Sequence, residues 1–330
     1  MKTYLHSPHL PITKSFLISV AVSFFLFIFF PALLHYKYIY TTQYIFFSVI
    51  TVGLLATYKR DHHFINERKE RISDKSLTLP MWGAFILLLI FSLIPFPVYR
   101  FFMYFKKTRV ISNTILYLLC VTALWIFGLK INLNKEAKAI KKKLKGKKCI
   151  YLSTHESSFD YFIIICVLML TDCQVVAGTN LLKFPVFGLY LKYKAILVNR
   201  GSLSSSKKML SKVKQFLDEG IPSVIFGEGG RKREGEIVSG VILREFKGGA
   251  FKIVDEYKEE VSIVPIIIDG SMEYKPPMKG DQNQKQWWNN PGSVEVIFME
   301  PLTQGKMSQD EFGNYVHDTM VSEIKRRGFV

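Results

Sequence analysis

Long apolar runs without a charged residue limit the fold of this chain more than any other feature. Residues 15–34 and 38–57 are each about as long as a helix that crosses a bilayer, and two further runs, 79–99 and 110–127, also lack charge. The first run is longer than the apolar part of a signal peptide, and a second run follows it closely. We therefore expect residues 1–129 to form a membrane anchor.

Basic residues indicate how this anchor is oriented. Loops 59–78 and 100–109 are both rich in Lys and Arg, which are enriched on the cytoplasmic side of membranes. A single span cannot join two loops on the same side, so we expect the first two runs to cross the membrane as a hairpin. The last two would then lie in or on the cytoplasmic leaflet, with Pro95 and Pro97 breaking the third run near its end. Four conventional spans fit the run lengths nearly as well.

From residue 130 onward, short β-prone runs alternate with stretches of helical periodicity. Apolar residues recur three and four positions apart in 205–220 and 308–327, which predicts amphipathic helices. Nearly continuous apolar strands between helices are typical of an α/β fold with a mainly parallel sheet covered on both faces. We expect such a globular domain at residues 130–330. The expected strands are 149–153, 195–198, 223–226, 262–268 and 294–299.

The net charge of +17 is concentrated beside the anchor, where residues 130–148 contain nine Lys and one Glu. This segment follows an apolar run and has no interleaved aromatic residues for base stacking, so contact with anionic lipid is favoured over nucleic acid. An ordinary solvated basic surface remains the alternative. The four cysteines, Cys120, Cys149, Cys166 and Cys173, have no metal-type spacing, and we expect them to be reduced and buried.

The stretch "STHESSFDYF" carries the first candidate for chemistry. His155 directly follows the expected strand 149–153, and Asp160 comes five residues later, where a helix is expected to begin near Ser157 or Ser158. A carboxylate bonded to one ring nitrogen would fix the tautomer of the imidazole and leave the other nitrogen as a proton acceptor. The pair can therefore form a general base. A histidine that only satisfies a nearby carboxylate at a strand end is the structural alternative.

Other chemistries fit this sequence poorly. The run "HESSF" lacks the second histidine of a zinc site, and the chain contains no G-x-S-x-G or Walker A motif. Two later strands are also followed by polar residues that could belong to the same site. Arg200 follows strand 195–198, and Glu228, Gly229 and Arg231 follow strand 223–226 on a glycine-rich turn. Exposed amides and guanidinium groups suit a phosphate or carboxylate ligand.

These motifs resemble those of the 1-acylglycerol-3-phosphate (lysophosphatidic acid) acyltransferases and related glycerophospholipid acyltransferases. His155 and Asp160 match the H-x4-D motif of that family, and Arg200 matches the arginine of its second motif. The sequence "FGEGGR" at 226–231 corresponds to F-P-E-G-T-R, and "FKGGAF" at 246–251 resembles the segment that follows. The resemblance covers about residues 80–330.

Three positions depart from the family pattern, and one further feature agrees with it. Thr154 stands in place of the usual Asn before the histidine, and Gly227 and Gly230 replace Pro and Thr in the third motif. We expect the two glycines to loosen the turn and to make the identity of the substrate less certain. Pro265 matches the proline of the family's later apolar strand.

The resemblance implies a glycerol-3-phosphate acyltransferase-like α/β fold and the transfer of a fatty acyl group to 1-acylglycerol 3-phosphate. It implies that His155, oriented by Asp160, removes a proton from the acceptor hydroxyl while that oxygen attacks an acyl thioester. No metal or cofactor is implied, since acyl-CoA or acyl carrier protein supplies the acyl group as a substrate. The domain would face the cytoplasm beside membrane phospholipids, which carry one of its substrates.

The same resemblance implies a phosphate site. Arg200 and Arg231, with amides around Gly229, would hold the phosphate of the acceptor, and Glu228 would position Arg231 or a glycerol hydroxyl. Other lysophospholipids, glycerol 3-phosphate and lipid amines remain open as acceptors. From a different class of function, a non-catalytic scaffold that binds anionic lipid also remains open.

Overall fold

A computed structural model of the chain describes Gly83 and residues 85–105, 109–127, 129–168, 172–184, 186–199, 201–231, 242–271 and 292–328. The two runs expected to cross the membrane, 15–34 and 38–57, lie outside the described residues, and so does the basic loop 59–78. Arg200 also lies outside them. The division into an anchor at 1–129 and a catalytic domain at 130–330 remains a prediction.

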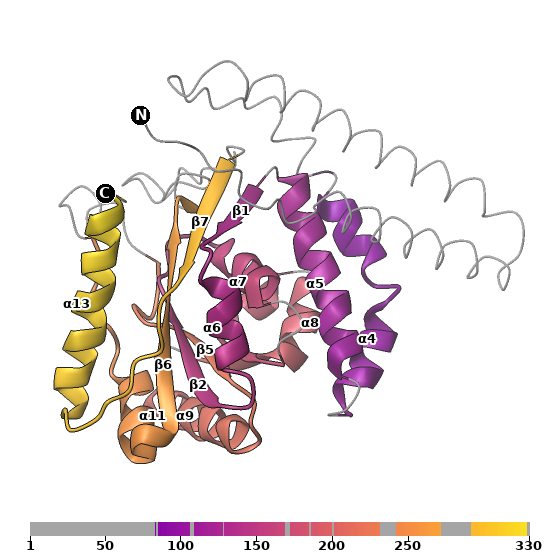
Figure 1. The fold of residues 1–330 in the computed structure, drawn as a ribbon. Coiled ribbons are helices and arrows are strands. Elements are labelled where there is room, and N and C mark those ends of the chain that lie inside the picture. Colours follow the sequence, from indigo (N-terminus) through magenta and orange to yellow (C-terminus); the bar gives the residue numbers. More distant parts are fainter. Residues whose placement is uncertain are drawn as a thin grey trace, which may run out of the picture.

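A seven-stranded sheet forms the centre of the described chain (Figure 1). Its strand order is β1-β7-β6-β2-β5-β3-β4, and every neighbouring pair is parallel except β6 with β7. The expected mainly parallel sheet is therefore confirmed. The strands are β1 (Leu129–Leu133), β2 (Lys148–Ser153), β3 (Gln174–Gly178), β4 (Ala195–Val198), β5 (Ser223–Phe226), β6 (Val261–Asp269) and β7 (Gly292–Phe298).

All five expected strands are present as β2, β4, β5, β6 and β7, whereas β1 and β3 were not predicted. Strand β1 lies at the edge of the sheet and pairs only with β7, which is far from it in the sequence. This long-range pairing, and not the local sequence pattern, makes the segment a strand. Its sequence "LKINL" overlaps the lysine-rich segment that indicated lipid contact. Strand β3 has only five residues, "QVVAG", which is too short for a clear sequence pattern. It lies between β5 and β4 in the sheet.

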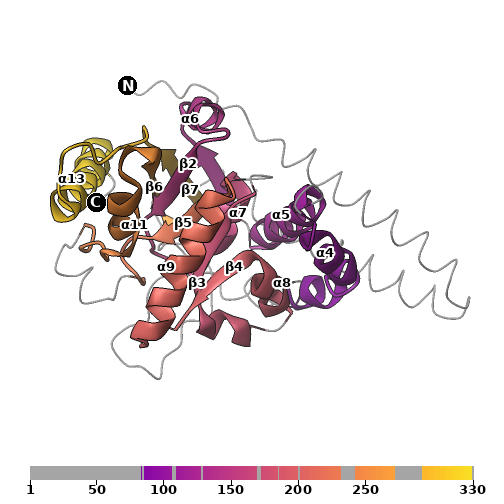
Figure 2. The ribbon, with the colours of Figure 1, turned by 90° about the horizontal axis from the view of Figure 1, so that it is seen from below.

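Helices cover both faces of the sheet, as expected. One face carries α4, α5, α6, α7 and α8, and the other carries α9, α11 and α13 (Figure 2). The bounds are α4 (Phe96–Met103), α5 (Arg109–Ile126), α6 (Ala137–Lys143), α7 (Asp160–Leu168), α8 (Phe187–Lys194), α9 (Leu203–Asp218), α11 (Gly249–Tyr257) and α13 (Gln309–Arg327), with the 3₁₀ helices η4 (Thr179–Lys183) and η5 (Lys258–Glu260).

Helices α9 and α13 confirm the two amphipathic patterns. The Ser202 side chain caps α9 by accepting a hydrogen bond from the backbone N–H of Ser205. In α13, Ser308 and Glu311 form a capping box. The buried side chains of α13 recur every fourth residue, which places them on one stripe of the helix against the sheet: Phe312, Val316, Met320 and Ile324.

The described part of the third apolar run is a broken helix. Segment Phe85–Phe91 and helix α4 meet at an angle of 60°, with Pro95 directly before α4 and Pro97 in its first turn. This break confirms the effect expected of the two prolines. In the described residues, α5 is the one helix whose length and composition allow a membrane crossing, and the bent pair counted as one span would make a second. Half of the apolar window of α5 is buried inside the protein.

Buried polar bonds join these helices to the α/β domain. We call Phe85–Phe91, α4 and α5 together the helical platform. The Tyr99 hydroxyl donates to the carbonyl of Tyr190 in α8 at 3.0 Å. Near the end of α8, the Lys194 ammonium donates to the Asn113 side-chain oxygen of α5 at 2.7 Å, although the Lys194 side chain is only 4% exposed. The platform is therefore fixed to the domain by directed bonds as well as by apolar packing.

The C-terminal end of α13 provides a test of the fold. Hydrogen bonds from Arg326 and Arg327 lower the pKa of Glu323 to about 2. Because the pKa is lower in the folded state, ionised Glu323 stabilises the fold above about pH 4.3, and this contribution is lost as the pH falls through about 2. Glu323→Gln should lower the urea midpoint of unfolding near neutral pH, and the difference from the parent should disappear near pH 2. A difference that does not change with pH would contradict the assignment.

Candidate active site

The candidate site lies where neighbouring strands send their connections to opposite faces of the sheet. Strands β2 and β5 are adjacent, with Ser153 paired to Phe226 at their carboxyl ends. From β2 the chain continues into α7 on one face, and between β5 and β6 it forms α11 on the other. Such a point opens a crevice beyond the strand ends, where ligands of α/β proteins usually bind. His155 and Glu228 each lie two residues past the paired ends.

Asp160 organises the loop that carries His155. One oxygen of its fully buried carboxylate, Oδ2, accepts three hydrogen bonds: from His155 Nδ1 at 2.8 Å, from the Glu156 N–H at 2.6 Å and from the Ser157 N–H at 2.8 Å. The expected contact between the imidazole and the carboxylate is therefore present. Helix α7 begins at Asp160 itself, slightly later than expected, so the negative charge also lies in its favourable first turn.

The Asp160 contact defines the protonation of the neutral imidazole. Because an ionised carboxylate can only accept hydrogen bonds, Nδ1 carries the proton and Nε2 keeps its lone pair. The His155 side chain is 13% exposed, and its ring stacks on Phe226 with 4.3 Å between ring centroids. Among the described residues, Nε2 has no hydrogen-bond partner. The arrangement can accept a proton from a ligand in the crevice.

The glycine turn after β5 is held firmly, contrary to the expectation that Gly227 and Gly230 loosen it. The Gly227 N–H donates to the Ser153 carbonyl at 3.0 Å, a bond that a proline could not make. A Cβ at Gly227 would meet the Phe246 ring at 2.7 Å, so Phe246 fills the space beside this glycine. Gly229 has a φ of +68°, which favours glycine. Contacts with Ser153 and Phe246 thus hold the turn.

Glu228 is turned inward and does not contact Arg231. Its fully buried carboxylate accepts from the His155 backbone N–H at 3.1 Å through Oε1. Its Oε2 accepts from the backbone N–H of Arg244 at 3.3 Å and from the Arg244 side-chain Nε at 3.4 Å. In the described residues Glu228 forms no ion pair with Arg231, so the direct positioning of Arg231 that the resemblance implies is not seen, and a role toward a glycerol hydroxyl remains a prediction. Glu228 instead links the His155 loop to the segment that contains Arg244.

Arg231 lies on the exposed side of the same turn. Its guanidinium donates to the Ser158 hydroxyl at 2.9 Å, which brings it beside the loop between His155 and Asp160. The structure thus brings together His155, Asp160, Glu228, Gly229 and Arg231. This constellation supplies a proton acceptor, an ordered glycine turn and an exposed guanidinium at one end of the sheet.

Sequence reasoning missed Arg244 and the part played by Phe246. Arg244 is 16 positions beyond Glu228, and no spacing rule joins them. The one available signal was the position of Arg244 just before "FKGGAF", the segment already matched to the family. Phe246 belongs to that segment, but its contact with Gly227 becomes visible only in the fold.

Two other kinds of site receive no support. All four cysteines are free and buried, as expected, and burial raises the pKa of the Cys149 thiol to about 12. Such thiols make poor nucleophiles at neutral pH. In the described part of the chain, no group of three His, Cys, Asp or Glu residues is arranged to hold a metal ion.

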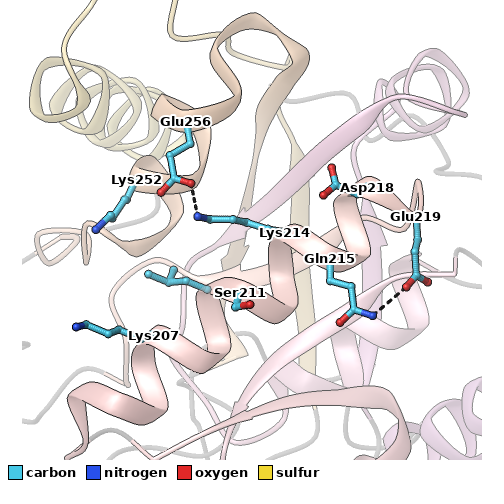
Figure 3. Close-up of a pocket in the computed structure, with 9 residues that line it drawn as sticks. Lys207, Ser211, Lys214, Gln215, Asp218, Glu219, Lys252 and Glu256 are labelled. Atoms are coloured by element: carbon cyan, nitrogen blue, oxygen red, sulfur yellow. Dashed lines mark hydrogen bonds and ion pairs between the residues drawn. The ribbon is translucent and has the colours of Figure 1, made fainter.

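A separate groove of about 730 Å³ lies between α9 and α11 (Figure 3). Its walls carry Lys207 and Lys214 from α9 and Lys252 and Glu256 from α11, with Lys214 paired to Glu256. None of the candidate site residues lines it. The groove is an open surface feature on the α9 and α11 face and is distinct from the strand ends at His155.

Three comparisons show which known proteins this chain is similar to. Residues 132–269 match the model of the family described as acyltransferase, and this match confirms the resemblance seen in the motifs. The crystal structure of the 1-acyl-sn-glycerophosphate (LPA) acyltransferase PlsC from Thermotoga maritima has a similar fold, with a TM-score of 0.51 and 19% identity. That match covers 73% of this chain and 96% of PlsC.

Two curated proteins are similar in sequence. A probable 1-acyl-sn-glycerol-3-phosphate acyltransferase from Mycoplasma pneumoniae is 25% identical over 176 residues, which is 52% of this chain and 63% of that protein. A 1-acyl-sn-glycerol-3-phosphate acyltransferase from Chlamydomonas reinhardtii is 25% identical over 161 residues, which is 48% of this chain and 44% of that protein. The chain thus spans less than two thirds of the length of either relative.

The tautomer of His155 can be measured directly. In protein labelled with ¹⁵N at histidine, the neutral His155 ring should carry its proton on Nδ1, because Asp160 accepts there. Asp160→Asn should weaken this preference, since an amide can also donate. Finding the proton on Nε2 in the parent protein would contradict the geometry.

Proposed function

We propose that this protein transfers a fatty acyl group from an acyl thioester to the free hydroxyl of 1-acylglycerol 3-phosphate, forming phosphatidic acid. One observation carries the proposal: the bond to Asp160 leaves Nε2 of His155 as a proton acceptor beside an ordered turn with an exposed guanidinium. The family of residues 132–269 and the names of the two curated relatives support it.

His155 acts as the general base in this reaction. Its Nε2 takes the proton of the acceptor hydroxyl while the oxygen attacks the thioester carbonyl carbon. The carbon–sulfur bond then breaks, and the imidazolium returns the proton to the departing thiolate. Asp160 stabilises the imidazolium through its bond to Nδ1. No acyl-enzyme is required, because both substrates can be held together and their orientation lowers the barrier.

The phosphate of the acceptor is assigned to the positive side of the glycine turn. Arg231 provides a guanidinium that can form two parallel bonds to phosphate, and Gly229 lets the chain turn sharply there. Arg200, placed by the sequence just after β4, is a further candidate for the same phosphate. The acyl donor is acyl-CoA or acylated carrier protein, and the described residues do not favour one over the other.

The helical platform is assigned to the membrane surface. Its helices and the residues that adjoin them expose large apolar side chains, whereas Tyr99 and Asn113 bond it to the domain. Exposed apolar surface of this kind is typical of membrane contact. With lipid substrates, an enzyme that rests on the cytoplasmic leaflet has direct access to its acceptor. The exposed residues include Ile86, Ile90, Leu93, Ile94, Val98, Phe101, Phe105, Val110 and Ile111.

The catalytic roles can be tested with purified protein, a labelled acyl thioester and a panel of lysophospholipids. The parent should acylate 1-acylglycerol 3-phosphate in preference to the other acceptors. His155→Ala should lower kcat by about 10³-fold or more through loss of the base. Asp160→Asn should lower it by about 10⁴-fold if, as in a serine protease, the wrong tautomer results.

Asp310→Asn is a matched control, because Asp310 is also in the first turn of a helix but is exposed on α13. It should keep the activity of the parent. Near-normal turnover in a folded His155→Ala protein would refute the mechanism, and binding of lipid without transfer to any acceptor would favour the scaffold.

The position of the platform can be tested by spin labelling. Because the native cysteines are buried, Phe101→Cys and Leu203→Cys can each be labelled selectively in liposomes. Phe101 is 58% exposed on α4, and Leu203 is 85% exposed on α9. The label at position 101 should be accessible to dissolved oxygen and shielded from a water-soluble nickel chelate, and the label at position 203 should show the reverse. Equal access of the chelate to both labels would place the platform in water.

A further inference from the structure

Arg244 lies on a short segment that is anchored on both sides. The Leu243 side chain is buried, and its carbonyl accepts a hydrogen bond from His317 Nε2 of α13 at 3.2 Å. Further along, the Lys247 N–H donates to the Gly227 carbonyl at 2.8 Å, and Phe246 packs against Gly227. These contacts hold the backbone of Arg244 against the glycine turn.

The Arg244 guanidinium compensates a buried charge. The Glu228 carboxylate is fully buried, and removing the partner of a buried charge is strongly unfavourable. Arg244 forms the ion pair with it, while its own side chain remains 24% exposed. The pair therefore lies at the edge of the core.

One guanidinium also joins two points of the turn. Besides its bond to Glu228, Arg244 donates to the carbonyl of Gly230. Gly230 directly precedes Arg231, the arginine assigned to the acceptor phosphate. The second oxygen of Glu228 accepts from the backbone N–H of His155. A chain of contacts thus runs from His155 through Glu228 and Arg244 to the residue before Arg231.

We propose that Arg244 is a positioning residue, which fixes the position of the general base His155 relative to the phosphate-binding Arg231. This inference rests on the proposed acyltransferase function. Arg244 acts through Glu228 on the His155 loop and through Gly230 on Arg231. A planar guanidinium can serve two acceptors in fixed directions, which the single ammonium of lysine cannot reproduce.

The test compares Arg244→Gln and Arg244→Lys in the full-length protein, with kcat and both KM values measured. Arg244→Gln should lower kcat by about 100-fold, the effect of a small misplacement of reacting groups. It should also raise the KM for 1-acylglycerol 3-phosphate and leave the KM for the thioester nearly unchanged. Arg244→Lys keeps the charge opposite Glu228, so it should recover much of kcat but not the acceptor KM.

A double-mutant cycle tests whether Arg244 acts through Glu228. In Glu228→Gln the buried charge is absent, so adding Arg244→Gln should lower kcat much less than it does in the parent. Arg327→Gln is the matched control, because Arg327 pairs with Glu323 on α13 and its side chain is 29% exposed. It should leave kcat and both KM values unchanged.

The proposal is overturned if the parent is active and Arg244→Gln keeps its kinetic constants, or if the loss of activity only follows the loss of folded protein. The ¹⁵N resonances of His155 give a readout that does not depend on activity. They should shift in Arg244→Gln and stay in place in Arg327→Gln, and unshifted resonances in Arg244→Gln would also overturn the proposal. If these shifts appear in Arg244→Gln but the parent transfers no acyl group, the proposed function is refuted and the positioning contact is supported.

Discussion

The candidate site depends on one buried oxygen. Oδ2 of Asp160 accepts two backbone N–H groups and the imidazole, so the loop after β2 closes around it. The other end of this loop is tied to the neighbouring strand, because Glu228 accepts the N–H of His155. Two buried carboxylates, Asp160 at the start of α7 and Glu228 in the turn after β5, therefore orient the backbone as well as the side chain of the histidine. The fold provides this arrangement because β2 and β5 end side by side.

The sequence predicts the parts of the structure that follow from local periodicity. Strands β2 and β5 and helices α9 and α13 were found within one or two residues, and so was the contact of His155 with Asp160, which are close in the chain. Edge strand β1 was missed because its strand conformation depends on pairing with β7, which lies more than 150 residues later in the chain. Arg244 was missed for the same reason, because its role depends on the Glu228 carboxylate, which only the tertiary fold brings close to it.

The departures from the family motif illustrate how neighbouring residues compensate each other. Gly227 alone suggests a flexible turn, but the Phe246 ring occupies the space that a side chain there would need. Gly230 lacks a hydroxyl, yet its carbonyl is engaged by Arg244. Thr154, in place of asparagine, bonds both the N–H and the carbonyl of Ile268 and so ties β2 to β6. The sequence of the motif differs, while Gly227 and Gly230 still form backbone hydrogen bonds.

The bonds between the helical platform and α8 have a mechanical consequence. Because Lys194 and Tyr99 bond the platform to the domain, the fold sets the position of His155 relative to the platform. With the platform on a bilayer, as proposed above, the acceptor would reach His155 by lateral diffusion in two dimensions. Turnover would then follow the mole fraction of the acceptor in the membrane rather than its bulk concentration, and dilution with inert lipid would slow the reaction at constant total acceptor.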